Sequence, residues 1–351
     1  MTSINQAHLT TGNQSPFLPG TKIQFAWDST SLGLFKTCPR LYQYTMIDGW
    51  GHSGESIHLR FGIEYHQALQ EYDILRAEGI SHADAIRNCI RNLLNRTMDF
   101  NPEPDTKVGK YKNRNTLLSL VLGYLDHYEN DPAETYIMQN GRPAVELSFR
   151  FELDWGPENN EYKCVNGHDL CNNMTPTAEC PYCEKQQNKQ PYVLCGHLDR
   201  VVNFNDQLLV MDHKTTTTTI SPSYFAQWEP NNQMSLYTIA GQIVLGTPIK
   251  GVCITAAQIL LTEPPRYVRG FTYRTPDQIE EWLSDLHQHL SLAEHYAKQD
   301  YWPMNDTACD KFGGCRFRGI CSKDPNVREA FLKADFEKLE EDKRWNPLRS
   351  R

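Results

Sequence analysis

The chain of 351 residues has a formal net charge of -8, which excludes a protein that is basic over its whole surface and coats nucleic acid. A local basic groove remains compatible with this charge. No apolar stretch is long enough to span a membrane, and residues 1–20 lack the basic-then-apolar layout of a signal peptide. We therefore expect a cytoplasmic protein that consists of one domain with insertions. In such a protein, the eleven cysteines are expected to be metal ligands rather than disulfide partners.

Helical and strand patterns alternate along the chain. Helices are predicted from a cap at Asp28 or Ser29 to about residue 44, and over residues 59–78, 81–98, 116–128 and 277–298. Strands are predicted over residues 145–153, 192–202, 207–214, 251–261 and 266–272. A polar, proline-containing loop is expected over residues 101–115, and a charged helical tail from residue 327.

Two neighbouring strands bring two acids and a lysine together. Asp199 lies on the first strand, and Asp212 and Lys214 lie on the second, after a short turn at residues 203–206. Lys214 is two residues beyond Asp212 and therefore points to the same face. Carboxylates hold Mg²⁺ or Mn²⁺, which polarise a phosphate and activate water, while a lysine can orient that water. The pattern predicts phosphodiester cleavage, although a surface ion pair would leave the same pattern.

Two further motifs flank this hairpin. His66 belongs to a Gly-x-x-x-His that begins at Gly62 and opens a helical pattern, and Gln233 and Tyr237 lie on one face of a later helix. Taken singly, His66 could be a helix histidine without a ligand role, and Gln233 and Tyr237 could serve ordinary packing.

Taken in order, Gly-x-x-x-His, Gly-x-x-Asp, Asp-x-Lys-Thr and Gln-x-x-x-Tyr resemble the RecB-type branch of the PD-(D/E)XK nuclease superfamily, from about residue 27 to residue 321. That branch includes the RecB and AddB nuclease domains and the CRISPR-associated RecB-like exonucleases. The resemblance implies an α/β fold with a restriction-endonuclease-like core, a mixed central sheet flanked by helices. It implies a Mg²⁺- or Mn²⁺-dependent exonuclease that acts on DNA ends or single strands in recombination, repair or phage DNA processing.

The same resemblance assigns roles to the motif residues. Asp199, Asp212, His66 and the main-chain carbonyl of His213 would bind the catalytic metal. Lys214 would position the nucleophilic water, and Gln233 and Tyr237 would steer the strand or support the lysine.

A first cysteine set lies at both ends of the predicted core. Cys309, Cys315 and Cys321 recur at even spacing, and Cys38 is the candidate fourth ligand. Four thiolates suit either [4Fe–4S] or Zn²⁺, and the spacing favours neither. Iron–sulfur members of the RecB-like families have one cysteine before the core and three after it, so the resemblance implies a 4Fe–4S cluster, although the first gap is longer here. Either centre would staple the chain by closing a long loop.

A second set lies in a predicted insertion over residues 160–190, which interrupts a hairpin and has almost no apolar content. Its Cys-Pro-x-Cys knuckle is typical of zinc sites and resembles small zinc ribbons. A zinc ion would then form the core of the insertion. The favoured ligands are Cys164, His168, Cys180 and Cys183, and Cys171 competes with His168.

The expected organisation is a flexible tail over residues 1–20, a helical region over 21–144, a nuclease core over 145–300, a cluster segment over 301–325 and a charged tail over 326–351. Basic runs from Lys107 to Arg114 and from Arg316 to Lys323 are either phosphate contacts or solvated faces. Two other functions fit the same motifs: a catalytically weak DNA-binding or scaffold component of a larger complex, and a nicking or processing endonuclease. A protein partner would belong to a recombination, replication or CRISPR-type complex in a bacterial or phage-infected cell.

Overall fold

The computed structural model describes residues 5–6, 15–52, 54, 56–157 and 190–349. The chain forms two compact units: unit 1 comprises residues 1–53, 148–196 and 283–351, and unit 2 comprises residues 54–147 and 197–282. Strands β5 (Val145–Glu152) and β6 (Val193–Phe204) and helix α9 (Pro276–Gln299) contribute residues to both units. Within the described ranges, no helix has the length and apolar character that a membrane crossing needs.

The sheet of unit 2 is mixed and has the strand order β6-β7-β8-β9, with β4 (Glu134–Thr135) also paired with β6. Strand β7 (Gln207–Thr216) runs antiparallel to β6 and parallel to β8 (Gly251–Gln258), and β9 (Arg266–Tyr273) is antiparallel to β8. The turn between β6 and β7 consists of Asn205 and Asp206, whose φ angles of 51° and 61° are those of a two-residue hairpin. The turn is shorter than predicted because β6 extends to Phe204, and β7 is longer at its other end, where it extends to Thr216.

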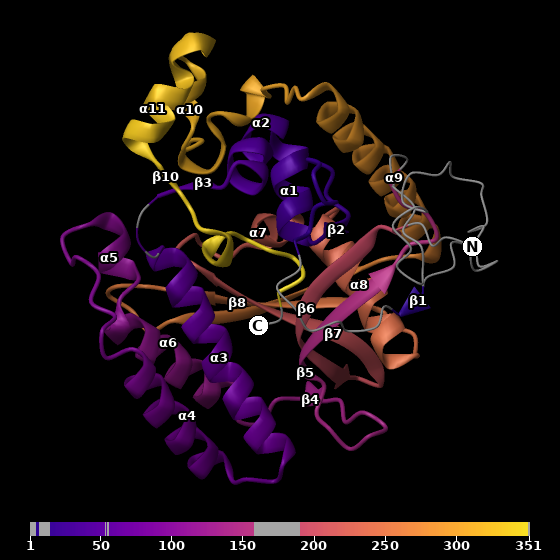
Figure 1. Ribbon diagram of the computed structural model, residues 1–351. Coiled ribbons are helices and arrows are strands. Elements are labelled where there is room, and N and C mark those ends of the chain that lie inside the picture. Colours follow the sequence, from indigo (N-terminus) through magenta and orange to yellow (C-terminus); the bar gives the residue numbers. More distant parts are fainter. Residues whose placement is uncertain (1–4, 7–14, 53, 55, 158–189, 350–351) are drawn as a thin grey trace. The chain divides into compact units, whose positions relative to one another are not determined.

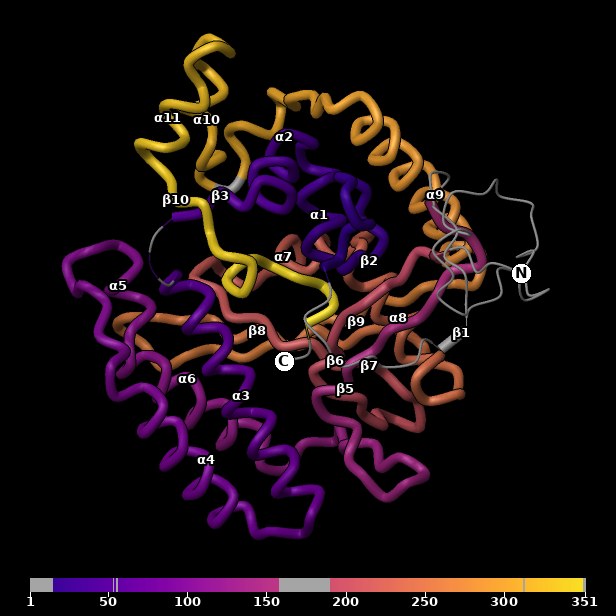
Figure 2. Tube along the Cα trace, in the orientation of Figure 1, coloured from indigo at the N-terminus to yellow at the C-terminus, as the bar shows by residue number. Residues whose placement is uncertain are grey.

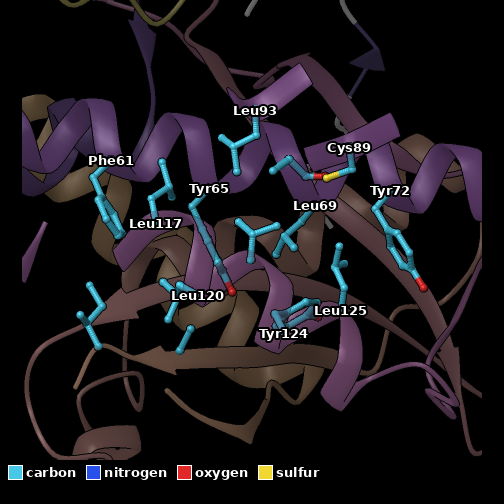
Figure 3. Packing of buried hydrophobic residues seen from close by; sticks show 14 of the residues in the cluster. Phe61, Tyr65, Leu69, Tyr72, Cys89, Leu93, Leu117, Leu120, Tyr124 and Leu125 are labelled. Carbon is cyan, nitrogen blue, oxygen red and sulfur yellow. The ribbon is translucent and has the colours of Figure 1, made fainter. Parts of the chain in front are cut away.

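Three helices cover one face of this sheet. Helices α3 (Ile57–Ala77), α4 (His82–Arg96) and α6 (Arg114–His127) pack side by side (Figure 1). Their apolar faces meet around Tyr65, Leu93 and Leu117, which are fully buried (Figure 3). The segment predicted as a loop over residues 101–115 contains a short helix, α5 (Lys107–Tyr111), because the Thr106 hydroxyl caps it by accepting from Gly109 N at 2.9 Å.

The other face is covered by α8 (Asn232–Leu245), which follows the short helix α7 (Pro222–Ala226). Gly241 allows α8 to approach β7 closely, because an added Cβ would lie 3.1 Å from the Val210 side chain. The alternation along β7 therefore directs Val210, Asp212 and Lys214 toward α8, and Met211 and His213 toward α6. The predicted mixed sheet flanked by helices is confirmed.

Unit 1 joins segments from both ends of the sequence. The predicted helix to residue 44 is broken, because Cys38 is extended and Pro39 begins a new helix: α1 (Ser29–Thr37), capped by Asp28, is followed by α2 (Pro39–Tyr42) and the π-helix η1 (Gln43–Ile47). Strand β2 (Ala26–Trp27) runs parallel to β6, and β1 (Asn5–Gln6) runs antiparallel to β5. Strand β3 (Trp50–Gly51) pairs with the yellow strand β10 (Glu337–Lys338), as Figure 2 shows.

The predicted C-terminal tail is helical only in part. Helix α11 (Arg328–Asp335) is followed by strand β10, and its Leu332 and Phe336 pack with Phe317 in a small core. The remaining helices of this region are α10 (Arg318–Cys321) and the 3-10 turns η3 (Asp306–Ala308), η4 (Lys311–Gly313), η5 (Pro325–Val327) and η6 (Glu341–Lys343).

Candidate active site

Strands β6 and β7 place Asp199 and Asp212 at adjacent positions. Arg200 pairs with Met211 in the antiparallel ladder, so Asp199, which precedes Arg200, lies opposite Asp212, which follows Met211. Asp212 is 1% exposed, and the Asp199 carboxylate accepts a hydrogen bond from His213 N at 2.9 Å. Two carboxylates from neighbouring strands are thus fixed by backbone geometry.

Lys214 connects Asp212 to helix α8. Its Nζ donates to Asp212 Oδ1 at 2.9 Å and lies 2.8 Å from Oδ2, and it also donates to Gln233 Oε1 at 3.1 Å. Gln233 Nε2 in turn donates to the Tyr237 hydroxyl at 3.0 Å. The Asn231 side chain caps α8 and fixes the position of Gln233 by accepting from its main-chain N at 2.9 Å. The lysine is therefore held between a carboxylate and an amide.

His66 reaches the same site from helix α3. Its Nδ1 lies 3.1 Å from Asp199 Oδ2. The structure thus brings together Asp199, Asp212, Lys214, Gln233, Tyr237 and His66, all within unit 2.

The two acids have opposite titration behaviour. Burial would raise the pKa of Asp199, but the charge and hydrogen bond of His66, with His213 and Lys214, outweigh burial and hold that pKa well below its usual range. Burial raises the pKa of Asp212, Lys214 opposes it, and the neighbouring Asp199 adds to it, so the net pKa is raised. Burial alone would lower the pKa of His66, and the Asp199 carboxylate reverses this, so that pKa is raised. Asp199 is therefore held in its ionised form, whereas the ionised form of Asp212 is less favourable than that of a free carboxyl group.

The His213 side chain packs beside His66, with ring centroids 6.1 Å apart. Burial lowers its pKa to about 3, which leaves the imidazole neutral, and its ring packs edge-on to Tyr124 with centroids 5.5 Å apart. The ring lies on the α6 face of the sheet, away from Asp212 and Lys214. A contribution of His213 to a metal on the α8 face is therefore limited to its main chain.

The donor set fits a hard divalent cation. Asp212 Oδ2 is buried and faces the Lys214 ammonium at 2.8 Å, and carboxylate oxygens are what Mg²⁺ and Mn²⁺ select. In the part of the chain that the structure describes, no three or more His, Cys, Asp or Glu side chains are grouped to hold a metal. The carboxylates of Asp199 and Asp212 fit such an ion, and His66 Nδ1 lies beside one of them.

Sequence reasoning missed two aromatic residues at this site. The Lys214 ammonium lies 5.4 Å from the centroid of the Trp228 ring, and Tyr224 is near enough to Asp212 that the carboxylate adds to the effect of burial in raising the tyrosine pKa. Both follow the threonine run 215–219 on or beside α7, and the only available signal was an aromatic cluster after the Asp-x-Lys strand. Glu64, which lies two residues before His66 on α3, is bound by Arg96 at 2.9 Å.

The cysteines of the first set all lie in unit 1, although among the described residues they are not grouped as a metal site. All four are free thiols, and Cys38 and Cys309 both contact Asn305. Burial raises the pKa of Cys321, with Cys315 and Cys38 adding to the effect and Arg40 and Arg328 opposing it. The pKa of Cys309 is raised by partial burial and by the neighbouring Cys315 and Cys38. The second set, in the predicted insertion, lies outside the described residues.

The family assignment follows from comparison with known proteins. The model of the PD-(D/E)XK nuclease superfamily matches residues 27–322, so the chain belongs to this superfamily. Among solved structures, the chain is similar to a protein from Eubacterium rectale provisionally described as an exonuclease, with 10% identity, a TM-score of 0.44, and coverage of 87% of this chain and 92% of that one. No curated protein matches the chain. The assignment rests on the family match.

The His66–Asp199 pair is open to a direct titration. In metal-free protein, NMR should give His66 a pKa above the ordinary value of about 6.5. Asp199→Asn should lower it below that value, because burial then acts unopposed, whereas Asp206→Asn in the exposed hairpin turn should leave it unchanged.

The pair also predicts a pH window for stability. Asp199 contributes above its ordinary pKa of about 3.9 and loses its contribution as the pH falls through its depressed folded pKa, whereas His66 contributes below about 6.5 and loses its contribution as the pH rises through its raised one. The destabilisation caused by Asp199→Asn, measured by denaturant unfolding, should therefore be larger at pH 5 than at pH 8. An equal loss at both pH values would contradict the assigned pairing.

Proposed function

We propose that this protein is a Mg²⁺- or Mn²⁺-dependent DNA nuclease, an exonuclease of RecB type that acts on DNA ends or single strands. One observation carries the proposal: Asp199 and Asp212 meet on adjacent strands, with Lys214 held beside Asp212 by Gln233. The superfamily supports a nuclease activity, and the RecB-type motif order supports the finer assignment.

The roles of the residues follow from their chemistry. Asp199 and Asp212 would hold the divalent cation, with His66 and the main-chain carbonyl of His213 completing its shell. When bound, the cation polarises the phosphate and lowers the pKa of water. Lys214 donates hydrogen bonds to the attacking water or to a phosphate oxygen and offsets the negative charge that develops there. Gln233 and Tyr237 fix the position of the ammonium, because Gln233 accepts a hydrogen bond from Lys214 and donates one to the Tyr237 hydroxyl. His66 holds the Asp199 carboxylate in place.

Two structural metal centres extend the proposal. A 4Fe–4S cluster on Cys38, Cys309, Cys315 and Cys321 is supported by the motif order and by four free thiols that influence one another. Burial raises the pKa of Cys321, and Arg40 and Arg328 oppose this by favouring the thiolate, which is the form that binds metal.

A structural zinc ion would be held in the insertion, and this proposal rests on sequence spacing alone. Its ligands would be Cys164, His168, Cys180 and Cys183, or Cys171 in place of His168.

Cleavage should depend on the acid–lysine pair. Asp212→Asn and Lys214→Met should each reduce cleavage of end-labelled DNA by about 100-fold or more, because transition-state charge loses its stabilising group. Both proteins should remain folded in thermal denaturation, and Asp206→Asn should cleave as the unmodified chain does. Chelation by EDTA should stop the reaction. Cleavage by the Lys214→Met protein at the unmodified rate would show that the site is wrongly assigned.

The same assay separates the alternative functions. An exonuclease degrades labelled linear DNA progressively and spares covalently closed circles, whereas a nicking or processing endonuclease opens the circles. Binding without cleavage under all divalent-metal conditions would identify a scaffold component instead.

The proposed cluster has an optical and analytical signature. Protein purified without oxygen should be brown and contain iron, because thiolate-bound iron clusters absorb visible light. Cys38→Ser should remove the iron and lower the resistance to unfolding, since the long loop between Cys38 and Cys309 is then open. Cys253→Ala, which changes a buried cysteine of unit 2, should retain the iron. Colourless protein with zinc and no iron would rule the cluster out in favour of zinc.

A further inference from the structure

Lys112 is a buried lysine without an acidic counterpart. It is 9% exposed and lies directly after α5, where its main-chain N–H donates to Val108 O at 2.8 Å. Among the described residues, no carboxylate pairs with its ammonium, and burial is what lowers the pKa of the group. Burying a cation without a counter-charge is costly, so a lysine kept in this state indicates an anion that the described part of the chain does not supply.

The ammonium lies at the N-terminal end of helix α3. Its Nζ is 5.4 Å from the centroid of the Phe61 ring, and it is close enough to His58 to add to the burial that lowers that histidine's pKa. Figure 1 shows α5 beside this end of α3. The Ser56 hydroxyl caps α3 by accepting from Leu59 N at 3.4 Å, and the other first-turn N–H groups of a helix have no acceptor within it. The 21-residue helix adds the positive end of its dipole.

Two independent features therefore converge on one ligand class. An unpaired buried lysine and the N-terminus of a long helix both select an anion, and phosphate oxygens match this arrangement. His58 is exposed and adds a further donor at the same turn.

A continuous helix ridge leads from this place to the catalytic site. His58, Gly62 and His66 recur at four-residue spacing and so lie along one side of α3. A Cβ added at Gly62 would meet no atom within 4 Å, so the middle of the ridge is open and a phosphate backbone can approach the helix closely. His58 and His66 are about 12 Å apart along the axis, a span of about two to four nucleotides of one strand.

We propose that Lys112 and the N-terminus of α3 bind a backbone phosphate of the DNA strand, two to four nucleotides from the scissile phosphate, and that the strand passes over Gly62 between the two sites. This inference rests on the proposed DNA nuclease function. It assigns a positioning role to Lys112, which lies apart from the catalytic lysine, and it explains the glycine of the Gly-x-x-x-His motif by access rather than by packing.

The test pairs a charge on the protein with a charge on the DNA. Single-stranded oligonucleotides carry one uncharged methylphosphonate linkage, moved stepwise along the strand, and affinity is measured in EDTA, where cleavage stops. In the unmodified protein, one linkage away from the cut should be sensitive. Lys112→Met keeps the stem on Phe61 but removes the charge, so it should weaken binding, abolish the sensitivity at that linkage, and reduce the salt slope by about 0.7 to 0.9.

Three further variants sharpen the result. Lys112→Arg should restore the positional sensitivity. Lys110→Met, at an exposed lysine of the same basic run, should leave it intact. Gly62→Gln should unfold at a higher temperature than the unmodified chain yet bind DNA less tightly, because a better helix former fills the open ridge. The Gly62 variant keeps the test decisive should Lys112→Met fail to fold.

The outcomes separate this inference from the proposed function. If the unmodified protein cleaves DNA but no linkage outside the cut is sensitive, or if Lys112→Met retains the sensitivity, the phosphate site is wrong and the nuclease proposal stands. If Lys110→Met abolished the sensitivity at that linkage as Lys112→Met does, the binding would come from a generally basic surface, and the proposed phosphate site would also be wrong. If the unmodified protein neither binds nor cleaves DNA, both proposals fail.

Discussion

Two carboxylates buried side by side require positive charge, and this constraint shapes the site. The hairpin register brings Asp199 and Asp212 to adjacent, largely buried positions, where like charges cannot both be ionised without compensation. His66 and Lys214 each neutralise one acid. These two positive groups offset the repulsion between the acids, and a divalent cation bound between the carboxylates could take over that role.

The position of β7 explains how one strand serves both the core and the site. Since β7 lies between an antiparallel and a parallel neighbour, its backbone is fixed on both sides. Because successive side chains of a strand point to opposite faces, Asp212 and Lys214 point to the α8 face, and Met211 and His213 point to the α6 face. The neutral, buried His213 ring packs against Tyr124 on the α6 face.

Much of this arrangement could be predicted from the sequence. Strong periodicity predicted α3, α4, α6 and the strands β5 to β9, and the period of two placed Lys214 beside Asp212 correctly. The Cys38–Pro39 step was a local signal for a break in the first helix that the prediction did not use. A single threonine cap, in contrast, gave little indication of α5 inside a polar loop. Trp228 and Tyr224 approach the site only through tertiary packing, so no spacing rule could assign them. The environment of Lys112 was equally hidden, because a basic run gives no indication of which lysine is buried.

The central claim is that Asp199 and Asp212 hold a divalent cation in competition with the charges that neutralise them. Calorimetric titration with Mn²⁺ in two buffers of different ionisation enthalpy measures both the affinity and the protons released. The account predicts metal binding with proton release near neutral pH, loss of that binding in Asp212→Asn, and unchanged binding in Asp206→Asn. Binding of Mn²⁺ with the same affinity and proton release in the Asp212→Asn protein would contradict it.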